Sequence, residues 1–128
     1  MTEPRRVHPP RILDASALVA LFHGNPTMLS MLDDAEVGSV FLLLPTVAIA
    51  EAESIVGAGS QLWEPFLLYR GVRSLDLTEH TAIEAGQLMT GTTLTVAQVV
   101  YEAQALNAVV VTRNGNVYSS HDVAVMVV

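Results

Sequence analysis

The chain has 128 residues, which fits one domain large enough to bury a core. Hydrophobic residues make up 51% of it and charged residues 15%, so extensive disorder is excluded. Thirteen acidic residues stand against six arginines, with no lysine and no cysteine, and the net charge is −7. The absence of lysine excludes a P-loop phosphate binder, a Schiff-base enzyme and a receiver domain. The absence of cysteine excludes thiol catalysis, disulfides and cysteine-bound zinc.

Neither a membrane span nor an export signal is predicted. The longest apolar stretch without a charge, residues 37–50, is too short to cross a bilayer and contains Pro45. The Arg5-Arg6 pair precedes an apolar run that is broken at Asp14, without a signal-peptide core or cleavage site. The four histidines lack the spacing of metal ligands. We therefore expect a cytoplasmic protein without a histidine-bound metal.

The first half of the chain alternates apolar strands with helices. Residues 1–10 are rich in proline and arginine, and we expect a flexible segment before a single domain, residues 11–128. Pro26 suits the first turn of a helix, and the aliphatic run at 40–44 suits a strand with both faces covered. In chain order we expect a strand at 11–14, helices at 16–22 and from 26 to before Gly38, a strand at 40–44, and helices at 46–56 and 60–69.

The second half continues this alternation. The segment 94–106 has apolar residues on more than one side, which predicts a well-buried helix. We expect in order a strand at 72–77, a helix capped by Thr78 that runs to 89, the helix at 94–106, a strand at 108–111, a loop at 114–116 and a strand at 123–128. This order predicts an α/β fold with a central parallel sheet of about five strands and helices on both faces.

Functional groups of such sheets gather beyond the carboxyl ends of the strands. In this sequence the rule points to four places: Asp14, the helix start from Thr46 to Glu51, Asp76, and the segment Thr112-Arg113-Asn114. These residues are therefore the first candidates for a functional site.

Asp14 and Glu51 admit two interpretations. A carboxylate beside a buried strand is costly unless a cation lies next to it, and oxygen ligands without histidine or cysteine suit Mg²⁺ or Mn²⁺. In the other interpretation Asp14 caps the helix that starts near Ser16, and Glu51 lies on a solvated face beside Glu53. Spacing alone leaves both open.

For several other residues the sequence favours a structural interpretation over a binding groove or a base-stacking platform. Met28, Met31, Trp63 and Phe66 have the spacing of core residues, and we expect them to pack in the interior. We expect solvated helix faces at a set of glutamates, namely Glu36, Glu53, Glu64, Glu79 and Glu84.

Three blocks resemble the successive motifs of PIN domains, as in VapC-type toxins. They are 12–18 (ILDASAL), 44–51 (LPTVAIAE) and 103–114 (AQALNAVVVTRN), and their order covers nearly the whole chain from Arg11 onward. The resemblance implies a three-layer PIN-like domain and an acidic pocket that holds Mg²⁺ or Mn²⁺. It further implies metal-dependent RNA cleavage, an antitoxin partner and a homodimer.

Carried over residue by residue, the resemblance assigns roles to individual side chains. Asp14 matches the first acid, Ser16 the small hydroxyl two residues on, and Glu51 the second acid. Asp14 and Glu51 are then catalytic metal ligands, and Asn114, with Ser16, positions metal-bound water. The expected lining of the pocket is Ser16, Thr46, Thr95, Gln98, Thr112, Arg113 and Asn116.

Two acids of the PIN pattern are missing. The third would fall near Val96, where only Thr95 and Gln98 are polar, and the fourth position holds Asn114 and Asn116. Glu102 lies about two turns, ~10 Å, further along the helix than Thr95, too far to replace the lost ligand. Weak binding of Mg²⁺ or Mn²⁺ follows, although one or two carboxylates plus a substrate phosphate can hold Mg²⁺.

Three hypotheses remain. The first is a metal-dependent endoribonuclease of a VapC-type toxin–antitoxin pair, with reduced activity. The second is a catalytically degenerate PIN-fold module that binds a protein partner. The third is a dimerising α/β domain whose acids are only helix caps. The net charge of −7 opposes RNA binding unless metal ions, a few arginines or a basic partner offset it.

Overall fold

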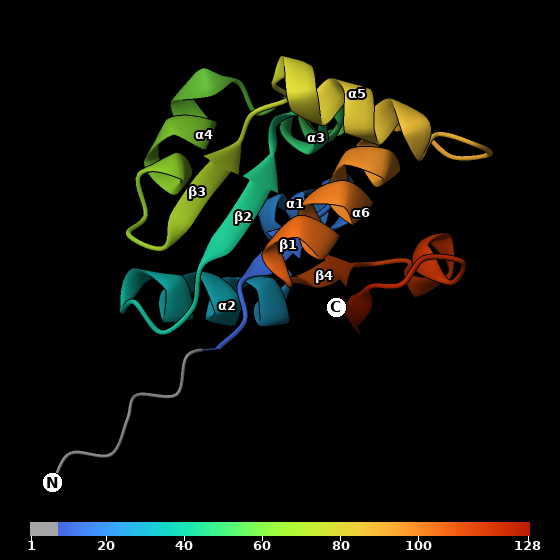
Figure 1. Cartoon of the computed structure of the whole chain (residues 1–128). Coiled ribbons are helices and arrows are strands. Elements are labelled where there is room, and N and C mark those ends of the chain that lie inside the picture. Colours follow the sequence, from blue (N-terminus) through green and yellow to red (C-terminus); the bar gives the residue numbers. More distant parts are fainter. Residues whose placement is uncertain (1–7) are drawn as a thin grey trace, which may run out of the picture.

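The computed structural model describes residues 8–128 and contains one five-stranded sheet (Figure 1). All neighbouring strands are parallel, in the order β3-β2-β1-β4-β5. The strands are β1 (Arg11–Leu13), β2 (Leu42–Pro45), β3 (Val72–Leu75), β4 (Val109–Thr112) and β5 (Ala124–Val127). The predicted flexible segment, residues 1–10, lies mostly outside the described residues.

Six α-helices and one short 3₁₀ helix connect the strands. They are α1 (Ala15–Phe22), α2 (Pro26–Glu36), α3 (Thr46–Val56), α4 (Ser60–Leu67), α5 (Glu79–Gln87), α6 (Leu94–Leu106) and η1 (Gly115–Tyr118). In the part of the chain that the structure describes, none of these helices is long and apolar enough to cross a membrane.

The sheet separates two hydrophobic cores because successive strand residues face opposite sides. Leu13 and Leu44 face a core built with α1, α2, α3 and α4, and this core includes the buried residues Met28, Met31, Trp63 and Phe66. Ile12 and Leu43 face the second core, which α6 and Tyr118 complete. The predicted three-layer α/β fold with a five-stranded parallel sheet is confirmed, as is the core position of the two methionines and two aromatic residues.

Most predicted elements have their expected positions. The bounds of α3 and α6 are those predicted, and Asn25 caps α2 by accepting from Met28 N, with Pro26 in the first turn. Strand β3 ends two residues earlier than expected, since its pairing with β2 ends at Leu75. The loop prediction at 114–116 was wrong in part because η1 begins at Gly115.

Candidate functional site

Asp14 stands directly between β1 and α1 and is 7% exposed. Its extended backbone ends the strand, and its Oδ1 accepts from Ala17 N at 3.0 Å, which caps α1. The same oxygen accepts from the Ser16 hydroxyl at 2.7 Å. The interpretation of Asp14 as a helix cap is therefore confirmed.

The second oxygen of Asp14 has its own donor. Tyr118, at the end of η1, donates its phenolic hydroxyl to Asp14 Oδ2 at 2.8 Å and is 2% exposed. Both oxygens of this buried carboxylate are thus bound by protein groups, so its desolvation is compensated without a cation.

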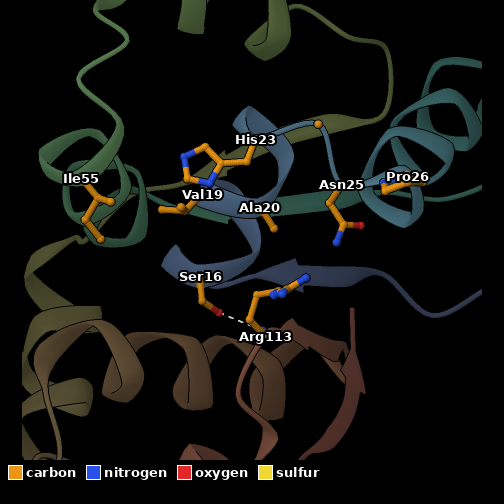
Figure 2. Close-up of a pocket in the computed structure, with 9 residues that line it drawn as sticks. Ser16, Val19, Ala20, His23, Asn25, Pro26, Ile55 and Arg113 are labelled. Carbon is orange, nitrogen blue, oxygen red and sulfur yellow. Dashed lines mark hydrogen bonds between the residues drawn. The ribbon is translucent and has the colours of Figure 1, made fainter.

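A chain of hydroxyl contacts joins Asp14 to the end of β4. Ser16 Oγ lies 3.2 Å from Thr112 Oγ1 and accepts from Arg113 N at 2.9 Å, a bond drawn in Figure 2. Thr112 Oγ1 in turn accepts from Asn114 N at 3.1 Å. The residues predicted from the ends of β1 and β4 therefore do form one cluster.

Glu51 lies exposed on α3, and its charge acts on the same cluster. The pKa of Tyr118 is raised, mainly by burial, then by the charge of Asp14 and its hydrogen bond, and also by the charge of Glu51. Two carboxylates therefore act on one phenolic hydroxyl, which keeps its proton and remains a donor.

Other predicted lining residues have partners elsewhere. Thr46 Oγ1 accepts from Leu77 N at 3.2 Å, and Gln98 Nε2 donates to Leu75 O at 3.1 Å. The two side chains therefore hold the backbone at the end of β3 and just beyond it. Thr95 is buried on α6, whereas Asn114, Asn116 and Arg113 are exposed around η1.

The donor set does not fit the divalent cation that the PIN resemblance implies. Within residues 8–128 no three His, Asp or Glu side chains are grouped so that they could hold a metal ion. Asp14 already has three protein donors, and Val96, where the third acid was expected, packs against the second core. A cation here would lack most of the oxygen ligands that it prefers.

A cavity of about 510 Å³ adjoins Ser16 on the α1 side of the cluster (Figure 2). Its walls come from α1, from Ile55 on α3, from the start of α2 and from Arg113 after β4. The residues are Ser16, Val19, Ala20, His23, Gly24, Asn25, Pro26, Ile55 and Arg113. Because this wall is largely apolar and has one arginine, the cavity suits a side chain of a peptide better than the phosphate groups of RNA.

One predicted surface carboxylate was assigned wrongly. Glu53 is half-buried and accepts from Ala58 N at 2.7 Å, Gly59 N at 2.8 Å and Trp63 Nε1 at 3.2 Å. Hydrogen bonds from Gly59 and Trp63 lower its pKa. Glu53 therefore fastens the turn between α3 and α4.

Sequence reasoning missed Tyr118, the one residue of the cluster that lies beyond the quoted motifs. The sequence feature that could have revealed Tyr118 is an aromatic residue within a polar segment that follows a buried strand. Such a ring has to find apolar cover, and here it packs in the second core.

Comparison with known proteins identifies the fold. No family model and no curated protein matches the sequence. Three similar solved structures are VapBC2 from Rickettsia felis bound to a promoter DNA fragment, a toxin–antitoxin complex from Klebsiella pneumoniae, and FitAcB from Neisseria gonorrhoeae. Their TM-scores are 0.68, 0.68 and 0.63, at 16%, 15% and 19% identity. Each alignment covers 91% of this chain and 96%, 95% and 96% of the other.

These similarities confirm the PIN-like fold that the sequence resemblance predicted. They extend over almost the full length of both chains, so the likeness is that of a whole domain. At these identities they establish the architecture of this chain.

Proposed function

We propose that this protein is the PIN-fold, toxin-like member of a toxin–antitoxin pair, and that it acts by binding a protein partner without cleaving RNA. The observation that carries the proposal is that both oxygens of Asp14 already have protein donors, namely Ser16, Ala17 N and Tyr118. A carboxylate held in this way stabilises the fold at the carboxyl edge of the sheet and has no oxygen left without a protein partner.

The partner is proposed to be an antitoxin-like protein. Solved structures with this fold include toxin–antitoxin complexes. The net charge of −7 favours a partner with basic segments, which electrostatic attraction would steer to this chain. The cavity beside Ser16 and Arg113 offers an apolar wall for one of the partner's side chains. A homodimer and a cytoplasmic location belong to the same proposal.

A metal-dependent ribonuclease is the second candidate. It is favoured by one observation, the charges of Asp14 and Glu51 acting on the same hydroxyl of Tyr118. One or two carboxylates, together with waters and a substrate phosphate, can hold Mg²⁺, so these two would suffice when RNA is bound.

An RNA cleavage assay separates the two candidates. Wild type, Asp14→Asn and the control Glu64→Gln, an exposed carboxylate on α4, are incubated with RNA and Mg²⁺ or Mn²⁺. We expect the same background cleavage from all three. Metal-dependent cleavage that Asp14→Asn abolishes and Glu64→Gln retains would establish the ribonuclease and overturn the proposal.

Partner binding is tested by co-expression with an antitoxin-like protein, sought as the product of a small gene immediately upstream. We expect a stable complex that Ile55→Asp, which places a charge in the cavity wall, weakens at least tenfold. Ile83→Asp is the matched control, because Ile83 on α5 is 58% exposed and Ile55 is 62% exposed. Equal weakening by both variants, or no complex at all, would contradict the proposed partner site.

A further inference from the structure

We propose that Tyr118 closes this site to divalent cations, because its hydroxyl takes the carboxylate oxygen through which Asp14 would bind a metal ion. The inference rests on the proposed function and explains how this chain came to have a site that does not depend on a metal. It makes Tyr118 a positioning residue that determines which ligands Asp14 accepts.

The geometry around Asp14 leaves little room for a cation. Oδ1 accepts from Ala17 N and Ser16 Oγ, so Oδ2 is the oxygen that a metal ion would need. The phenolic oxygen of Tyr118 lies 2.8 Å from Oδ2. A cation bound to Oδ2 would have to share this oxygen with the hydroxyl, or displace the hydroxyl and leave it without its partner in a buried site.

Tyr118 cannot easily move aside. Its ring is 2% exposed and belongs to the second core, together with Val99, Val100 and Ala103 of α6. The backbone of η1 is held by Val117 N donating to Asn114 O and by His121 N donating to Tyr118 O. A buried ring in a close-packed core is displaced only at the expense of that packing.

The beginning of the same segment is also fixed. Arg113 N donates to Ser16 Oγ and Asn114 N donates to Thr112 Oγ1, so the backbone on the way to η1 is tied to α1 and β4. The hydroxyl of Tyr118 therefore lies against Asp14 on a segment whose backbone is held at both ends. Glu51, exposed on α3, is then a second carboxylate whose charge acts on that hydroxyl.

Removing the phenolic oxygen of Tyr118 should allow Asp14 to bind a divalent cation. Tyr118→Phe keeps the ring in the core but leaves Asp14 Oδ2 without its donor. A divalent cation can then bind this oxygen and keep waters in place of the acids that the site lacks, since carboxylate oxygens suit Mg²⁺ and Mn²⁺. Wild type, whose site is closed to the cation, and Tyr118→Phe, whose site is open to it, thus differ by one hydroxyl.

The test is binding of Mn²⁺ alone, followed by electron paramagnetic resonance and by the shift of Tm with added Mn²⁺. Five proteins are compared, namely wild type, Tyr118→Phe, Asp14→Asn, the double variant Tyr118→Phe/Asp14→Asn, and Tyr101→Phe as the control on α6 outside the cluster. We expect Mn²⁺ affinity at least tenfold higher in Tyr118→Phe than in wild type, lost in the double variant and unchanged in Tyr101→Phe.

Two results would overturn the inference. One is Mn²⁺ binding by wild type that matches Tyr118→Phe. The other is saturable binding by wild type that Asp14→Asn abolishes, a result that requires no Tyr118 variant to fold. If wild type takes up no Mn²⁺ and also binds no partner, only the proposed function is contradicted. The first of these results, obtained with a folded Tyr118→Phe that still binds its partner, contradicts only this inference.

Discussion

The hydroxyl of Tyr118 donates to Asp14 across 104 positions of the sequence. The contact follows from the order of the strands, because β1 and β4 are parallel neighbours with Leu13 opposite Val111. The segments that leave these two strands therefore emerge side by side at one edge of the sheet. Asp14 is the first residue after β1, and η1 is the first helix after β4.

Asp14 should contribute more to stability than a surface carboxylate does. Asp14→Ala removes the cap of α1 and leaves the buried hydroxyl of Tyr118 without an acceptor, so we expect a loss of about 1–3 kcal/mol in the free energy of unfolding. Asp14→Asn retains a capping oxygen and should lose less. Urea denaturation of both variants measures the difference, and equal stability of wild type and Asp14→Ala would contradict the role of this network.

Most of the fold could be predicted from local sequence signals. Aliphatic runs indicated four of the strands closely, since a parallel strand covered on both faces carries apolar residues on both. Thr78 was predicted to cap a helix, and its side chain accepts from Thr81 N three residues on. Pro26 likewise marked the first turn of α2. Strand ends were less accurate, as with β3, because they depend on where the neighbouring strand stops.

The candidate site was only partly predictable. Asp14, Ser16 and Thr112 were selected by their position after neighbouring strands, and they do lie together. Tyr118 was missed because its role depends on a contact between distant segments. Glu53 was misjudged because its three donors lie in the following turn and helix, whose path the sequence pattern does not specify.

Glu53 gives a prediction with a defined pH dependence. Its pKa is lowered in the folded protein, so its contribution is present above the ordinary pKa of a glutamate and is lost as the pH falls through the lowered pKa. Glu53→Gln should therefore lower Tm at neutral pH, and the difference from wild type should shrink in acid. Thermal melts across this range test it, and a difference that stays constant with pH would contradict the assignment.

Glu102 should have the opposite pH dependence. This residue of α6 is 9% exposed, and burial raises its pKa. The folded protein therefore keeps a proton that the unfolded chain has released, so stability falls as the pH rises from the ordinary glutamate pKa through the raised one. Glu102→Gln should match wild type in Tm at about pH 4 and exceed it at about pH 7.5. The control Glu84→Gln on α5 should show no such divergence, and its appearance in both variants would refute the burial effect.

Alanine should lower the free energy of unfolding at one glycine of this chain and raise it at another. A Cβ at Gly71 would lie 2.6 Å from the carbonyl oxygens of Ala35 and Val40, both backbone atoms that cannot yield without moving α2 or the segment that leads into β2. Gly71→Ala should therefore cost about 1–3 kcal/mol, as other overpacked cores do. A Cβ at Gly86 in α5 meets nothing within 4 Å, and Gly86→Ala should stabilise the helix by about 0.5–1 kcal/mol. Chemical denaturation of the two variants measures both signs, and a stable Gly71→Ala protein would mean that the segment between β2 and β3 packs less tightly than described.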